Sequence, residues 1–555
     1  MFSVDVTSSR NITRKKREPT FFPSAEQPYN ADGSLNLVQT FTGDGNYLKF
    51  EGSSFQGRKY YTETSLNYDR SFNKHRIGGL ILYNQEDRTN AAASDFTSSI
   101  PYRLRGVAGR ATYSYNDRYF AEVNVGYNGS ENFAPKKRYG FFPAFGIGWL
   151  LSGEKFFEPL KNAITFFKVR YTNGYAGDDV LDGRRFAYID VLSEGAAGYN
   201  YGTTQQTGIS GINISDYAVN VTWAKSHKQD LGFEIKTLKD KLSLTVDLFK
   251  EHRTGIFLRR GAIPAFVGLV NAPFGNLGIV DNKGIEGTLE NNMNIGRVAL
   301  SVRGTFTYNK DNVIENDQSP STYPWMDRRG SNVLAQYGYI ADGLFTSDQE
   351  IASSAVPGVR ENVRPGDIKY RDLNGDGQIN AYDVTRIGRG DVPAIVYGFG
   401  FNIAYKNFNL GVFMQGTAMA QRYISGNAIQ PFSTNGGISN AFAIATDRWT
   451  EDSPDQDAFY PRLAYGDAAN SNNTQTSSWW IKDVSFLRLK TADLGYTLPK
   501  STFQKLGMRN ARIYMMGNNL FTLSKFKLWD AEINTGNGTT YPNVRTISVG
   551  MTAQF

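Results

Sequence analysis

Apolar and polar residues alternate along most of this chain, from about residue 60 to the last residue, Phe555. Successive side chains of a β-strand point to opposite faces, so this period predicts strands with one apolar and one polar face. Segment 240–250 illustrates the pattern: Leu242, Leu244, Val246 and Leu248 interleave with Ser243, Thr245 and Asp247. No sustained stretch has apolar residues at the spacing of an amphipathic helix. The sequence therefore predicts an all-β protein.

The alternating segments group into about fifteen candidate strands. They are 62–71, 75–84, 103–115, 119–129, 138–151, 164–175, 221–236, 240–254, 280–290, 296–309, 394–405, 408–420, 479–497, 510–522 and 543–555. Most are close to the roughly 9 to 11 residues with which a strand crosses a membrane at a slant. Segment 46–55 is a candidate for a sixteenth strand.

The connections between these strands alternate in length. The short ones are 116–118, 238–241, 291–295 and 406–407, and the long ones are 178–220, 255–279, 310–393 and 421–478. Short turns on one side and long loops on the other are typical of an outer-membrane β-barrel. A soluble sandwich of about fifteen strands would be exceptional, and a propeller would show a repeat of about 40 to 50 residues, which we do not find.

The last candidate strand has the same alternation, with Ile547, Val549 and Met551 on one face and a terminal Phe555. Such an ending resembles the assembly signal of outer-membrane barrels. If this end lies on the short-turn side, counting strands backward places the long loops outside the cell and gives an odd number. Single-chain bacterial barrels have even numbers. We therefore expect a strand upstream of the chain, unless 46–55 supplies it, and we expect residues 1–59 to form an extracellular loop with part of a strand.

Composition excludes several other classes of protein. The chain has 60 Lys and Arg against 53 Asp and Glu, a net charge of +7 that is too small to indicate nucleic acid as a partner. The basic run 14–17 is short and isolated, as in a solvated loop. There is no cysteine, so disulfides, thiolate metal sites and cysteine nucleophiles are excluded. No apolar run approaches the roughly 18 to 20 residues of a membrane helix.

No motif in the sequence indicates a catalytic site. The three histidines, His75, His227 and His252, have no metal-ligand spacing. Neither a Gly-x-Ser-x-Gly elbow nor a phosphate-binding Gly-x-x-x-x-Gly-Lys loop occurs, and no carboxylate pair stands out as acid and base. We therefore predict that the protein is not an enzyme and has no catalytic residues.

A series of motifs in a fixed order resembles the SusC-like (SusC/RagA-type) TonB-dependent outer-membrane transporters, over residues 60–555. The motifs are Phe141-Phe142-Pro143 to Trp149, Glu154 to Phe157, Lys168 to Tyr171, Asn276 to Gly287, Gly366-Asp367-Ile368-Lys369-Tyr370, Leu487 to Lys490, Leu494 to Tyr496 and Asn518 to Phe521. One departure lies in 525–532, where Ala531 stands in a pattern that more usually ends in Asp-Pro-Glu. This departure puts the geometry of that external loop in doubt.

The resemblance implies a barrel of about 22 strands that follows a plug domain, a TonB-contacting segment and a signal peptide. No region before residue 60 resembles any of these. We therefore expect 60–555 to be the C-terminal barrel portion of such a transporter, with 15 to 16 of its strands and without the plug domain. The implied partners are a SusD-like lipoprotein, the TonB complex, outer-membrane lipid and a glycan or peptide substrate.

One segment has the spacing of a twelve-residue calcium loop. Its candidate ligands are Asp372, Asn374, Asp376, the carbonyl of Gln378 and Asp383, with Gly377 at the sharp turn and Asn380 acting through water. Position 12 is Asp383 and not Glu, so bidentate closure is less certain. No clear helices flank the loop, which therefore resembles dockerin-like loops. The alternative is an Asx-rich turn without metal; if calcium binds, its role is structural, in an external loop.

Aromatic residues fall into two groups. Those at strand ends, such as Tyr113, Tyr115, Tyr127, Trp149 and Tyr405, match the interfacial girdles of a membrane barrel. Those in long loops are candidates to stack on sugars or peptide side chains, or to pack against a partner. The loop candidates are Tyr323, Trp325, Tyr337 and Tyr339.

These observations favour a transporter of the Gram-negative outer membrane that imports oligosaccharides or peptides. Polar residues such as Ser243, Thr245, Asp247, Arg303 and Thr305 would face the lumen. Two alternatives stay open: a diffusion porin of about sixteen strands that needs neither plug nor energy, and a β adhesin whose calcium loop organises an external ligand surface.

Overall fold

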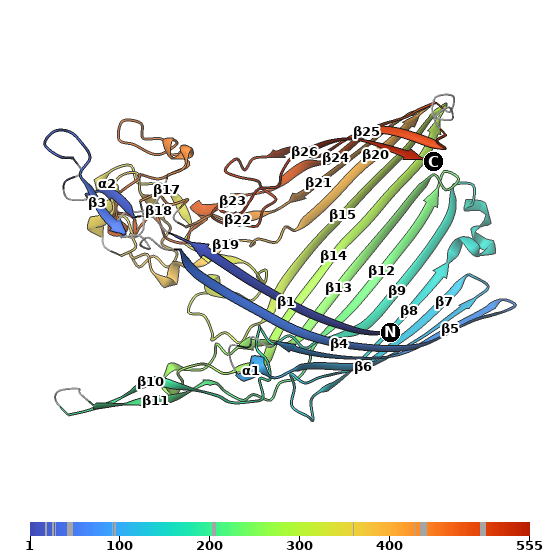
Figure 1. Ribbon diagram of the computed structural model, residues 1–555, viewed down its shortest axis with the longest axis horizontal. Helices are drawn as coiled ribbons and strands as arrows, with labels where there is room; N and C mark the ends of the chain where they lie inside the picture. The colour runs from blue at the N-terminus through green and yellow to red at the C-terminus, as the bar shows by residue number, and fades with distance from the viewer. Residues whose placement is uncertain are drawn as a thin grey trace.

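The computed structural model consists mainly of one antiparallel sheet of sixteen strands (Figure 1). It describes residues 1–16, 19–24, 27, 29–41, 48–90, 93, 96–202, 207–358, 360–426, 428–432, 441–499 and 507–555. The strands of the large sheet, in their order across it, are β1 (Phe2–Lys15), β4 (Lys49–Phe72), β5 (His75–Asn90), β6 (Tyr102–Tyr115), β7 (Tyr119–Ser130), β8 (Tyr139–Leu150), β9 (Ile164–Asp178), β12 (Ala224–Thr237), β13 (Leu242–Arg259), β14 (Phe274–Ile295), β15 (Val298–Glu315), β20 (Ile395–Tyr405), β21 (Phe408–Ala418), β24 (Phe486–Thr497), β25 (Asn510–Ser524) and β26 (Thr546–Gln554).

Smaller elements lie in the connections. Five two-stranded sheets pair β2 (Thr20–Pro23) with β3 (Leu37–Phe41), β10 (Val191–Tyr201) with β11 (Thr207–Asp216), β16 (Gln336–Gly338) with β19 (Thr385–Gly388), β17 (Ala341–Leu344) with β18 (Ile368–Tyr370) and β22 (Gln421–Tyr423) with β23 (Ile481–Asp483). The α-helices are α1 (Phe96–Ser99), α2 (Asp348–Ser353) and α3 (Asp467–Asn470). Short 3-10 turns occupy 151–153, 155–160, 265–267, 324–326, 360–362, 381–383, 443–446 and 478–480. Across the described ranges, no helix is both long and apolar enough to span a membrane.

Each of the fifteen predicted strands corresponds to a strand of the large sheet, and the sixteenth is β1. The predicted strand 479–497 is too long, because only β24 (Phe486–Thr497) belongs to the large sheet, whereas Ile481–Asp483 forms β23 in a separate sheet. The prediction that 46–55 supplies the sixteenth strand is wrong, because Lys49–Phe72 forms a single strand, β4. Residues 1–59 contain the whole of β1 and the beginning of β4, which is more strand than the sequence led us to expect. In the basic run 14–17, which we expected to be a loop, Arg14 and Lys15 belong to β1, and Arg17 lies outside the described residues.

The alternation of short and long connections is confirmed, with two corrections to its details. The predicted loop 255–279 is shorter than expected, since β13 continues to Arg259 and β14 begins at Phe274, which leaves 260–273 as the connection. The turn between β14 and β15 is formed by Gly296 and Arg297, because Ile295 already pairs with Val298. The long connections gather at one end of the strands, and both chain termini lie toward the other (Figure 1).

Strand register keeps one face of the sheet apolar across many strands. Residues on this face stand directly opposite one another from β9 to β20, as in the row Val169, Phe233, Val246, Gly287, Phe306 and Tyr397. Large apolar side chains on this face are exposed, for example Leu248 (43%) and Leu289 (43%). The opposite face carries charged and hydroxyl residues, such as Thr245, Asp247 and Arg303. We call these the outer and inner faces, as expected for a barrel in lipid.

Aromatic side chains border the outer face at its short-turn end, as the girdle prediction requires. Tyr115 stacks near Tyr119, and Tyr119 near Trp149, with ring centroids 6.4 Å apart in both pairs. At other strands of the same end, Phe408 lies 4.7 Å from Tyr496. Tyr and Trp side chains are enriched at membrane–water interfaces because they combine an apolar ring with a polar group.

An added positive charge should affect stability differently on the two faces of the sheet. We expect Val246→Arg, on the outer face, to destabilise the folded barrel by about 2–4 kcal/mol in lipid. The neighbouring Thr245→Arg, on the inner face, should cost much less because its side chain enters water. Urea titrations in lipid vesicles, read by gel mobility with and without heating, measure both. Equal losses of stability would contradict the assignment of faces.

Candidate functional site

A cluster of charges occupies the inner face where β9, β12 and β13 meet. Arg170 Nη1 lies 3.0 Å from Asp230 Oδ1, and the same guanidinium contacts Asp247 and Glu234. Gly232 leaves the space for this cluster, since a Cβ there would lie 2.5 Å from Asp247 Oδ1 and 2.6 Å from Arg170 Cζ. The sequence prediction that Asp247 belongs to the polar face is confirmed. Such paired charges make the inner wall hydrophilic.

The other residues predicted to face the lumen share this inner face. Ser243 and Thr245 alternate with the apolar residues of β13, and Arg303 and Thr305 do so on β15. Arg303 Nε lies 3.4 Å from Glu290 Oε1 on the neighbouring strand. A hollow with a volume of 640 Å³ lies along the inner wall beside the Arg170 cluster, lined by residues that include Thr112, Glu122, Asn124, Lys168, Arg170 and Thr172. A polar solute therefore finds donors and acceptors along this wall.

Three long connections, 316–394, 419–485 and 525–545, pack together at the other end of the strands into a unit that we call the cap. Its apolar core includes the buried side chains Leu344, Ile368, Tyr370, Ile424, Ile429, Trp449, Tyr460, Trp480 and Phe526. Burial of such side chains stabilises each by about 1.5–3 kcal/mol relative to exposure. The cap is therefore a packed body and not a set of independent loops.

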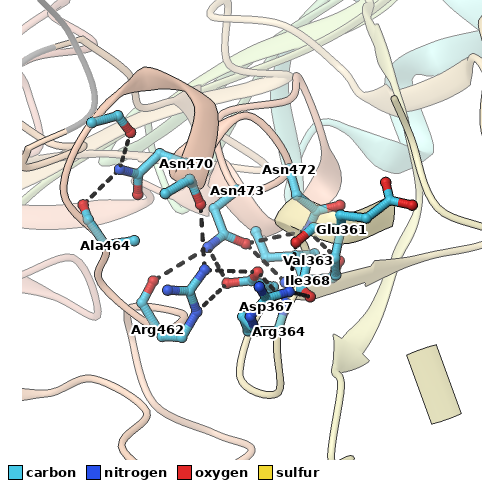
Figure 2. Close-up of polar contacts among 12 residues, drawn as sticks. Glu361, Val363, Arg364, Asp367, Ile368, Arg462, Ala464, Asn470, Asn472 and Asn473 are labelled. Atoms are coloured by element: carbon cyan, nitrogen blue, oxygen red, sulfur yellow. Dashed lines mark hydrogen bonds and ion pairs between the residues drawn. The ribbon is translucent and has the colours of Figure 1, made fainter. Parts of the chain in front are cut away.

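A buried ion pair joins two of these connections (Figure 2). Asp367 is completely buried, and Arg462 donates to both of its carboxylate oxygens, over 2.9 Å and 3.0 Å. Asn473 Nδ2 donates to the same carboxylate over 2.8 Å, and the backbone N–H of Arg364 donates to it over 2.9 Å. These donors leave neither carboxylate oxygen of Asp367 without a hydrogen-bond partner.

The residues around Asp367 explain one of the motifs noted in the sequence. Gly366 has a φ of +85°, and a Cβ there would lie 2.1 Å from the Trp449 ring, so only glycine fits. The Asn472 side chain donates to the carbonyl of Ile368 over 2.8 Å, and the Tyr370 hydroxyl donates to the carbonyl of Asn472 over 2.7 Å. Burial raises the pKa of Tyr370 far above its usual value, so this hydroxyl keeps its proton.

A second buried arginine holds the connection 525–545 against β24. Arg488 Nη1 lies 2.6 Å from Glu532 Oε2, and its other amino group contacts Asp530. The N–H donors from Arg488 and Glu532 keep the pKa of Asp530 below its usual range, in spite of the opposing effect of burial. Ala531, the unusual residue of this segment, is buried in the core of the cap. The departure from the family pattern therefore leaves both carboxylates in place.

The predicted calcium loop forms a series of Asx turns within the cap. Asp372 accepts from the backbone N–H groups of Gly375 and Gly377, over 2.7 Å and 2.8 Å. Asp383 is buried and closes the loop by accepting from the N–H groups of Leu373 and Asn380. The donor set is carboxylate, amide and carbonyl oxygen, which suits a hard cation.

Two other ligand candidates hydrogen-bond within the same loop. Asn374 Oδ1 accepts from the N–H of Asp376, and Asp376 Oδ1 accepts from the N–H of Gln378. The Asn374 side chain and the Gln378 N–H lower the pKa of Asp376. In the described part of the chain, no group of three or more carboxylate or imidazole side chains lies close enough together to hold a metal ion.

The aromatic residues predicted to contact substrate lie in the cap, where their side chains stack on, hydrogen-bond to or pack against other residues of the cap. Tyr323 stacks on Trp325 with ring centroids 4.6 Å apart, and Trp325 Nε1 donates to the carbonyl of Tyr382. Tyr337 donates to Ser331 Oγ over 2.8 Å. The remaining candidate, Tyr339, packs against the core of the cap. The pair Tyr323 and Trp325 adjoins the predicted calcium loop, where Tyr382 contacts Tyr323 edge-on.

The remaining predicted residues lie apart from the cap. Phe555 follows β26 and is exposed, and its part in assembly stays a prediction. Each histidine ring makes a side-chain hydrogen bond: His75 with Tyr113, His227 with Asn173 and His252 with Asp281. Sequence reasoning missed Asp367, Arg462 and Arg488. The motifs Gly366 to Tyr370 and Leu487 to Lys490 were the available signals for the first and the last of these.

In comparisons with known proteins, the chain is similar to TonB-dependent receptors. No protein-family model matches it. The chain is 28% identical to TonB-dependent receptor P26 of Formosa agariphila, in a match that covers 100% of the chain and 59% of that protein. It is 26% identical to TonB-dependent receptor P3 of the same bacterium, covering 89% and 52%. It is 24% identical to TonB-dependent receptor SusC of Bacteroides thetaiotaomicron, covering 87% and 47%.

Solved structures agree on the fold. The RagAB peptide transporter matches with a TM-score of 0.73 at 18% identity, over 100% of this chain and 59% of the matched chain. The RagAB peptide importer in its closed-closed state gives 0.71 at 19% identity, over 100% and 59%. The chain spans about half the length of the curated relatives that it matches. The resemblance noted in the sequence is confirmed for the part of those proteins that the chain covers.

The buried ion pair of the cap predicts a large local effect of one substitution. Asp367→Ala leaves the Arg462 guanidinium without its counter-charge, which should destabilise the cap by about 3–5 kcal/mol. Hydrogen exchange of the amides of β18 measures this loss.

Asp342→Ala is the matched control, since Asp342 pairs with the largely exposed Arg371 at the surface of the same connection. Removal of an exposed pair should cost at most about 1 kcal/mol. If the two variants exchange β18 amides at equal rates, the buried pair does not hold the cap together.

Proposed function

Starting from the sequence and fold of a SusC-like TonB-dependent transporter, we propose that this protein imports oligosaccharides or peptides across the outer membrane. The observation that carries the proposal is the pair of opposite faces in the large sheet. An apolar outer face suits lipid, and a charged inner face, with Arg170 among three carboxylates, suits the passage of polar solutes. The relatives named TonB-dependent receptor support the same class of transport.

The cap supports a role in binding a partner or a substrate outside the cell. Its three connections are held in one arrangement by Asp367, Arg462 and Arg488, so it offers a defined surface at the loop end of the barrel. We propose that this surface receives a SusD-like lipoprotein and that the TonB complex energises transport. The pair Tyr323 and Trp325 is the candidate contact for a sugar ring or a peptide side chain.

We also propose that the loop from Asp372 to Asp383 binds calcium as a structural ion. The proposal is supported by its oxygen donors and by Gly377, whose φ of +80° makes the tight turn. Asp372, Asn374, Asp376, the carbonyl of Gln378 and Asp383 would hold the ion. Calcium would fix the loop beside Tyr323 and would take no part in chemistry.

Uptake measurements separate the proposal from its alternatives. In the native host, deletion of the gene should abolish uptake of a labelled oligosaccharide or peptide, and complementation should restore it. A protonophore should stop this uptake if it depends on TonB. Uptake that persists in de-energised cells would favour the diffusion porin, and a loss of surface binding with unchanged uptake would favour the adhesin.

Calcium should stabilise the cap by about 2.7 kcal/mol at one hundred times its dissociation constant. Thermal unfolding with calcium or with a chelator measures the shift, and Asp372→Ala should abolish it. Asp455→Ala is the matched control, because Asp455 makes the same kind of Asx turn by accepting from the N–H of Asp457 elsewhere in the cap. An equal calcium response in the unmodified protein and Asp372→Ala would contradict a site in this loop.

A further inference from the structure

Three lysines stand directly opposite one another on adjacent strands of the large sheet. Lys250 of β13 pairs in register with Lys283 of β14, and Lys283 pairs with Lys310 of β15. All three side chains are exposed. Neighbouring strands lie about 4.7–4.9 Å apart, so the three Cα atoms fall within about 10 Å. We call these residues the lysine row.

The lysine row lies on the outer face, at the margin of its apolar surface. Two residues along each strand toward the short turns, the next row on this face is Leu248, Ile285 and Tyr308. A hollow of 570 Å³ is lined by both rows and by Tyr171. In the other direction each strand continues toward the long connections, so the row occupies the boundary between the apolar belt and the cap end of the molecule.

Polar groups on β9 and β12 continue this boundary. Asn173 and Gln229 lie in the same cross-strand row as Lys250, and both donate to the hydroxyl of Tyr171 over 3.2 Å. The Tyr171 ring belongs to the apolar row, while its hydroxyl reaches the polar one. A tyrosine in this position is typical of a membrane–water interface.

Like charges directly opposite one another destabilise a sheet unless a counter-charge is present. Among the described residues, none of the three lysines makes an ion pair, whereas Arg170 on the inner face contacts Asp230, Asp247 and Glu234. One carboxylate stands in the next row of the outer face, Asp281, and it lies 2.6 Å from His252 Nδ1. The chain therefore brings three positive charges together without supplying their counter-ion.

We propose that the lysine row binds the phosphate groups of a phosphorylated lipid in the outer leaflet of the membrane. Lysine is a compact charge that suits phosphate, and basic clusters beside an apolar surface bind anionic lipid head groups. The apolar row below Lys250, Lys283 and Lys310 would contact the acyl chains of the same lipid. This inference rests on the proposed function in one respect, that the outer face lies in a membrane.

The test compares the purified full-length protein with a variant that carries Lys250→Gln, Lys283→Gln and Lys310→Gln. Both are placed in nanodiscs that contain a phosphorylated glycolipid or its dephosphorylated form, and bound lipid is counted by native mass spectrometry. We expect the unmodified protein to retain the phosphorylated lipid at least fivefold better than the variant, and the two proteins to retain the dephosphorylated lipid equally. The matched control carries Lys239→Gln, Lys241→Gln and Lys406→Gln, three exposed lysines at the short-turn end, and should behave as the unmodified protein.

Two further measurements keep the outcomes distinct. In detergent without lipid, Lys283→Glu should raise the melting temperature, because it converts three like charges into an alternating row. Inorganic phosphate that displaces the lipid at millimolar concentration would overturn the lipid assignment in favour of a free anion site. Equal lipid retention by the unmodified protein and the lysine-row variant would overturn the inference altogether. A protein that fails to enter nanodiscs as a β-sheet would refute the membrane barrel itself, and thus the proposed function.

Discussion

The register between neighbouring strands is the constraint on which the rest of the molecule depends. Because side chains alternate between faces, a slip of one residue in one strand would move its apolar residues to the polar face. The observed register instead carries single rows across many strands, such as the row through Val169, Val246 and Phe306. The same ladder satisfies the backbone hydrogen bonds of the central strands, which a lipid environment requires.

The cap follows a different principle, because its long connections have little regular structure to order them. Buried ion pairs supply that order: Asp367 and Arg462 join segments that are 95 residues apart in the sequence. Such a pair adds little net stability compared with apolar packing, but it strongly disfavours arrangements that leave either charge unpaired. A loop end that is fixed in this way is suited to recognition, and the polar inner wall below it is suited to passage.

Features of the structure that depend on residues close together in the sequence could be predicted, and features that depend on distant residues could not. Alternation is local, and it predicted all fifteen strands from 62–71 to 543–555. It missed β1 because Ser8 and Arg10 interrupt the apolar face of that strand. Segment 46–55 was recognised as a candidate strand but not as the beginning of β4. Gly57 interrupts the alternation between this segment and the predicted strand 62–71, so the two were not joined.

The contacts of the cap could not be predicted in the same way, since they join residues far apart in sequence. The turn-forming character of Asp372 to Asp383 was visible, whereas the partners of Asp367 and Arg488 were not. The lysine row was equally hidden, because each lysine is unremarkable within its own strand and only the register brings Lys250, Lys283 and Lys310 together.

The central claim is that one face of the sheet contacts lipid and the other contacts water. The chain has no native cysteine, so single cysteines can be placed at successive positions of β13 from 243 to 248 and spin-labelled in membranes. We expect spin labels at 244, 246 and 248 to be highly accessible to a lipid-soluble relaxation agent. Labels at 243, 245 and 247 should be highly accessible to a water-soluble agent. Accessibility without this alternation, or with water-soluble access on both faces, would contradict a membrane barrel.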